Sequence, residues 1–107
     1  MHTEQFFGDQ KYTFALTDEM ILELERKTDL GIGALYLRAV NMAFSLTDLT
    51  EVIRLGLIGG GKSPEHAKTL STTYGTNRPI HEIYPLALDI LDARWGEPKA
   101  SEEDAAQ

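Results

Sequence analysis

The sequence contains no cysteine, no long hydrophobic run and few basic residues, and each lack excludes a class of protein. Without cysteine the chain forms no disulfide and no thiolate–metal site. Its apolar runs extend over only a few residues, whereas a membrane-spanning helix needs about 18 or more. The N-terminus also lacks a basic region followed by an apolar run, so we expect neither a membrane span nor a secretory signal.

Acidic residues outnumber basic ones, with 17 Asp and Glu against 10 Lys and Arg, for a formal net charge of −7. Nucleic acids and anionic membranes are bound through basic patches, so we expect neither as a partner. Part of the excess lies in residues 97–107, where four acidic residues stand against one lysine. We predict that this segment is an acidic, disordered tail and that residues 1–96 form a single small domain.

The order of apolar residues predicts an α+β protein that is mostly α, with an N-terminal β-hairpin followed by a bundle of about four to five helices. The hairpin is expected over residues 5–16, with its turn at Gly8-Asp9 and with Tyr12, Phe14 and Leu16 facing the core. The helices are expected over about 18–29, 32–46, 48–58, 64–74 and 80–95.

Local signals support several of these boundaries. Thr17 and Ser63 are good helix N-caps, and Pro64 follows at the first helical position, where its missing N–H is harmless. Residues 32–46 carry the most regular apolar stripe, with apolar side chains recurring every three to four residues as far as Phe44. We therefore expect this helix to lie at the centre of the core, and the next helix to take its N-cap from the segment that starts at Thr47.

The stretch from Gly56 to Ser63 matches the phosphate-binding pattern G-x-x-x-x-G-K-[ST] at Gly56, Gly61, Lys62 and Ser63. A true phosphate loop follows a buried strand of a parallel sheet, whereas residues 47–58 fit a helix better. We interpret the match as coincidental, with Gly59–Gly61 ending one helix and Ser63 starting the next. A P-loop nucleotide-binding protein is the less favoured alternative.

No other group of residues predicts chemistry. The three histidines (His2, His66 and His81) are too scattered for a metal site. Glu23 and Glu25 lie two positions apart on a helix and point to different sides. We therefore predict no catalytic residues, no cofactor and no metal, and a protein that is not an enzyme.

Several apolar residues lie off the predicted core stripes: Leu22, Leu37, Met42, Leu46, Leu55 and Ile58. They could form a surface for a partner or for self-association. They could equally complete the core of a multi-helix domain. Trp95 is expected to pack in the core at the end of the last helix, and a partner-binding anchor is the less favoured alternative.

Three runs in this order, Tyr12–Leu16, Leu22-Glu-Leu-Glu25 and Glu51–Gly60, resemble a family of small proteins encoded with the tail genes of gene transfer agents and tailed phages. The similarity covers about residues 5–95. It implies a short β-element followed by a helical domain, and a role in building a phage-like tail. Members are described as tail assembly chaperones and sometimes labelled tail tube proteins.

The resemblance implies a tail assembly chaperone that binds a tail component such as the tape-measure protein, in the cytoplasm of a bacterial host or in the phage-like particle. The expected partner-binding residues are Arg54, Leu55, Leu57 and Ile58. A homo-oligomer is compatible with this role. A structural tail component such as a tail tube subunit is the alternative. We rank it second because a tube wall usually needs a large β-sheet.

Overall fold

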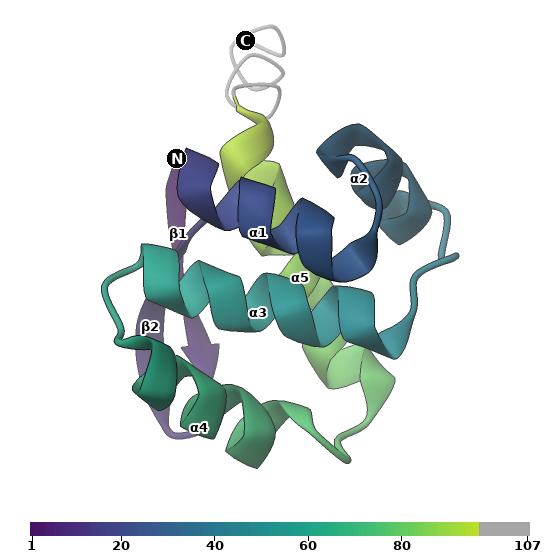
Figure 1. The fold of residues 1–107 in the computed structure, drawn as a ribbon. Helices are drawn as coiled ribbons and strands as arrows, with labels where there is room; N and C mark the ends of the chain where they lie inside the picture. Colours follow the sequence, from purple (N-terminus) through teal and green to yellow (C-terminus); the bar gives the residue numbers. More distant parts are fainter. Residues whose placement is uncertain (97–107) are drawn as a thin grey trace, which may run out of the picture.

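The computed structural model describes residues 1–96 and places a two-stranded antiparallel hairpin before five α-helices (Figure 1). The elements are β1 His2–Phe7, β2 Gln10–Ala15, α1 Asp18–Thr28, α2 Ile32–Val40, α3 Leu46–Gly59, α4 Pro64–Gly75 and α5 Ile80–Trp95. The predicted fold class, α+β and mostly α, is confirmed. The predicted acidic tail, residues 97–107, lies outside the described residues.

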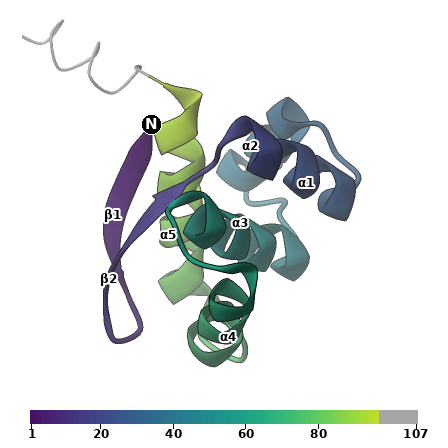
Figure 2. The same cartoon turned by 60° about the vertical axis from the view of Figure 1, so that its left-hand side comes forward.

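The hairpin turns at Gly8, whose φ of 71° is the left-handed conformation that glycine tolerates best. Strand β1 begins at His2, earlier than predicted, and pairs with β2 so that Gln5 lies opposite Tyr12. As predicted, Tyr12, Phe14 and Leu16 are buried. Figure 2 shows the hairpin at one side of the molecule, with the helices against one of its faces.

Helix α3 is the centre of the structure and packs against α1, α4, α5 and β2 (Figure 1). The expectation that residues 32–46 form the central helix was wrong. Apolar side chains of α3 point in several directions, and its buried residues include Leu49, Val52, Ile53, Leu55 and Leu57. A helix that is apolar around most of its circumference must be surrounded by other elements.

Helix α2 is shorter than predicted, since it ends at Val40 instead of continuing to residue 46. Met42 adopts a left-handed φ of 59°, and the chain then turns into α3. The N-cap of α3 is Ser45 and not a residue of the Thr47 segment, since Ser45 and Asp48 form a reciprocal capping box. The Asp48 carboxylate also accepts hydrogen bonds from Arg38, at 2.7 Å from Nη2, which ties α2 to the start of α3.

Aromatic residues attach α2 to α5. The Tyr36 hydroxyl donates to Asp92 at 2.6 Å, and the Tyr36 ring stacks on Trp95 with centroids 4.4 Å apart. The Tyr84 hydroxyl donates to the carbonyl of Ala39 at 2.9 Å. The hydrogen bond to Asp92, together with burial, raises the pKa of Tyr36 to about 12.

Candidate functional site

The phosphate-loop-like stretch joins two helices. The element before it is α3, and the sheet in residues 1–96 is a two-stranded antiparallel hairpin, which lacks the parallel strands of a phosphate-loop fold. Gly60 is the C-cap of α3. Ser63 caps α4 as predicted, with its hydroxyl oxygen accepting from the His66 N–H at 3.1 Å.

The glycines of this stretch allow a close contact between α3 and β2. A Cβ built on Gly59 would overlap the carbonyl oxygen of Ala15 and lie 2.8 Å from its carbon. A Cβ on Gly60 would overlap the carbonyl oxygen of Thr13 in the same way. The end of α3 therefore lies directly against the outer edge of β2, which only residues without a side chain permit. Sequence reasoning found the helix end but missed this contact.

Lys62 packs over an aromatic ring. Its Nζ lies 5.3 Å from the centroid of Tyr12, within the range of a cation–π interaction. The Tyr12 hydroxyl donates to Asp9 at 2.8 Å, and burial, followed by this hydrogen bond, raises the pKa of Tyr12. Lys62 thus contributes to the contact between the glycine stretch and the hairpin.

The four predicted partner-binding residues lie in different environments. Leu55 and Leu57 are in the core, with 2% and 0% of their surface exposed, so neither side chain belongs to the molecular surface. Ile58 is partly buried against the core, and Arg54 is held by a bidentate ion pair with Glu51. Partner binding through Arg54 and Ile58 stays a prediction.

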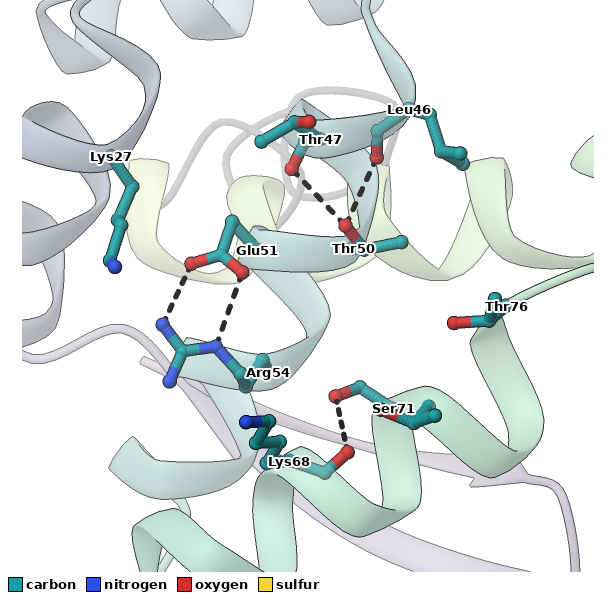
Figure 3. Close-up of a pocket in the computed structure, with 10 residues that line it drawn as sticks. Lys27, Leu46, Thr47, Thr50, Glu51, Arg54, Lys68, Ser71 and Thr76 are labelled. Carbon is teal, nitrogen blue, oxygen red and sulfur yellow. Dashed lines mark hydrogen bonds and ion pairs between the residues drawn. The ribbon is translucent and has the colours of Figure 1, made fainter.

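A groove of about 490 Å³ lies between α3 and α4, close to the end of α1 (Figure 3). We call it the α3–α4 groove. Three cations line it, Lys27 from α1, Arg54 from α3 and Lys68 from α4, together with Glu51. Five hydroxyl side chains complete most of the wall, those of Thr47, Thr50, Ser71, Thr72 and Thr76. In Figure 3, Lys27 and Lys68 approach the Glu51–Arg54 pair from different sides.

A second candidate surface is apolar and lies on the outer side of α2. We call it the α2 surface, formed by Leu37, Val40 and Met42, which are 59%, 40% and 67% exposed. A hollow of about 300 Å³ beside Leu37 also involves Ala34 and Ala43. Of the nine residues of α2, Leu35 and Ala39 are buried and four are exposed, so one side of this apolar helix faces solvent.

The structure divides the apolar residues whose role the sequence left open. Leu22, Leu37, Met42 and Leu46 are exposed, whereas Leu55 is buried and Ile58 packs against the core. Completion of the core therefore holds for Leu55 and Ile58, and a partner surface at the four exposed residues stays a prediction. Trp95 stacks on Tyr36 and is still 46% exposed.

Within residues 1–96, His66 and His81 are exposed, and no group of three His, Cys, Asp or Glu side chains is arranged to hold a metal ion. No helix in that range is both long and apolar enough to cross a membrane.

A comparison with protein families gives one match over residues 2–97, to the family described as "Phage tail tube protein, GTA-gp10". No curated protein and no solved structure matches the chain.

Proposed function

The chain belongs to the family described as phage tail tube protein, GTA-gp10, and from this membership we propose that it is a structural protein of a phage-like tail. In this role it binds other tail proteins and has no catalytic step. The family description fits a tail tube subunit better than the tail assembly chaperone that we expected first from the sequence. A tail tube subunit, associated with the phage-like particle, is therefore our leading proposal.

The structural observation that supports an assembly role is the α2 surface. A monomeric protein gains little from an apolar helix face that contacts only water, and clustered exposed apolar side chains commonly mark protein–protein interfaces. Leu37 and Met42 are each more than half exposed and lie on or just after the same short helix. We propose that the α2 surface packs against a neighbouring copy in the assembled tail.

Charge substitution on this surface tests the proposal. We expect the wild-type chain to form concentration-dependent assemblies, measured by sedimentation velocity and by electron microscopy for rings or tubes. The double substitution Leu37→Asp and Met42→Asp should reduce association by at least about tenfold, because burying a carboxylate at an interface without a partner is strongly unfavourable.

Leu22→Asp is the matched control, since Leu22 is exposed to a similar degree, 65%, but lies on α1 outside the α2 surface. It should assemble like the wild type, and circular dichroism should show that all variants remain folded. Equal assembly of wild type and the double variant would exclude the α2 surface as the contact. A wild-type chain that stays monomeric at all concentrations would contradict the tube-subunit role.

One observation favours the tail assembly chaperone as a second candidate. The sheet in residues 1–96 has two strands, too few by themselves to form a tube wall, and the exposed apolar side chains lie mainly on helices. A chaperone would use the α2 surface to cover apolar segments of a partner such as the tape-measure protein. Co-expression with a neighbouring tape-measure gene should then yield a complex that the Leu37→Asp, Met42→Asp variant loses.

A further inference from the structure

The distribution of ion pairs singles out the α3–α4 groove. All five arginines in residues 1–96 have a carboxylate partner: Arg26 with Glu23, Arg38 with Asp48, Arg54 with Glu51, Arg78 with Glu82 and Arg94 with Asp18. None of the four lysines in that range (Lys11, Lys27, Lys62 and Lys68) forms an ion pair with another residue of it, and two of them, Lys27 and Lys68, line the same groove. Two positive charges without an ion-pair partner, carried by different helices, therefore line the same groove.

The groove is positive on a molecule that is otherwise negative. Residues 1–96 contain nine Lys and Arg against 13 Asp and Glu, for a net charge of −4. The groove combines three cations with the single carboxylate of Glu51, for a local charge of +2. The remaining surface carries about −6, so an anionic ligand is repelled elsewhere and attracted here.

The polar groups of the groove select an anion with several charges along its length. Several of its hydroxyls are already used within their own helices, since Thr50 donates to Leu46 and Ser71 donates to Ala67. The charged donors without an ion-pair partner are the ammonium groups of Lys27 and Lys68, which project from different helices into an open groove of about 490 Å³, and the hydroxyls of Thr47, Thr72 and Thr76 are neutral donors beside them. An acidic peptide presents carboxylates at such separated points, and its backbone can run along the groove.

We propose that the α3–α4 groove binds the acidic segment 97–107 of a second copy of this chain. The segment has Glu97, Glu102, Glu103 and Asp104 against Lys99, a net charge of −3 that complements the positive groove. This inference deepens the proposed structural role and depends on it, because it supplies a contact between neighbouring subunits.

The end of α5 lies at the opposite end of α1 from the groove. Arg94 near the end of α5 pairs with Asp18 at the start of α1, at 2.7 Å, so Gly96 lies at that end of α1. Lys27 lies in the last turn of α1, roughly 14 Å further along the helix axis. A contact from the end of one copy to the groove of the next is asymmetric, and such contacts repeat into rings or filaments.

Peptide binding tests the groove directly. A fluorescein-labelled peptide of residues 97–107 should bind the full-length protein in an anisotropy titration, more weakly as salt is raised. Lys68→Glu should weaken binding about tenfold, since it removes an attraction and adds a repulsion. The matched control is Lys11→Glu, which makes the same charge change at an exposed lysine of β2 outside the groove. Absence of binding at millimolar protein, or equal weakening by the two variants, would overturn the proposal.

Complementary charge reversal tests the second copy. A Lys27→Glu, Lys68→Glu chain and a Glu102→Lys, Glu103→Lys chain should each associate about tenfold less than wild type in sedimentation velocity. An equimolar mixture should recover association, because each variant then offers the charge that the other lacks. Wild-type protein that remains monomeric, or a mixture without recovery, would overturn the intermolecular contact. A monomeric wild type would contradict both proposals, whereas failed peptide binding contradicts the groove contact alone and the α2 variants test the structural role separately.

Discussion

Replacing Gly59 with alanine should be costly, although the same change inside a helix is usually favourable. Gly59 is the last residue of α3, and its backbone lies against β2. An added Cβ would overlap the carbonyl oxygen of Ala15 and lie 2.8 Å from its carbon. Carbon atoms in good contact are about 3.5–4.0 Å apart, and the carbonyl oxygen is nearer still, so α3 and β2 must separate by more than about 1 Å.

The magnitude follows from two opposing effects. Overpacking at a well-packed contact costs about 1–3 kcal/mol. The upper end applies here because the obstructing group is backbone and cannot rotate away. Alanine gains up to about 1 kcal/mol over glycine in helix propensity. The expected net loss is therefore about 2 kcal/mol, which corresponds to a fall in melting temperature of roughly 8–16 °C for a domain of this size.

This loss is measured by thermal and urea unfolding, with far-ultraviolet circular dichroism as the signal. Gly33→Ala is the matched control, because Gly33 is also helical but a Cβ there has nothing within 4 Å. It should be neutral or stabilising by up to about 1 kcal/mol. If Gly59→Ala proves as stable as Gly33→Ala, the close contact between α3 and β2 is not a requirement of the fold.

Two further substitutions test how α2 is held in place. Asp48→Ala removes the reciprocal cap with Ser45 and the ion pair with Arg38, and should lower the free energy of unfolding by about 2 kcal/mol in urea titrations; a change below about 0.5 kcal/mol would contradict this. Tyr36→Phe tests the hydrogen bond to Asp92, which raises the pKa of Tyr36 to about 12 against about 10 in an unfolded chain. Its contribution is fully present below pH 10 and is lost as pH rises towards 12, because the unfolded state releases the proton first. The wild type should therefore lose more stability than Tyr36→Phe between pH 10 and 12, and parallel curves would refute the assignment.

The sequence predicted the parts of the fold that depend on neighbouring residues. Gly8-Asp9 fixed the turn of the hairpin, and Thr17 and Ser63 marked the starts of α1 and α4. These signals act within a few residues through backbone hydrogen bonds and allowed dihedral angles. The predicted boundary between α2 and α3 was wrong, because the apolar period continues to Phe44 while the chain leaves α2 through a left-handed Met42 and starts α3 at the Ser45–Asp48 cap.

The candidate surfaces depended more on the tertiary structure. From the sequence, Leu37 and Leu55 were equivalent apolar residues, and their different burial follows from α2 lying at the edge and α3 at the centre. No pattern in the sequence indicates that Lys27 and Lys68 lie near each other. They line one groove because α1 and α4 both pack against α3.

The sequence by itself determined the mostly helical class, the hairpin and the acidic character, because composition and short-range patterns suffice for these. Only the tertiary structure decided what the glycine stretch does. Gly59 and Gly60 end a helix, as expected, but they are required to be glycine by the carbonyl groups of Ala15 and Thr13, which approach from a strand more than 40 residues earlier in the chain. Packing between distant segments is a property of the fold, and no local pattern encodes it.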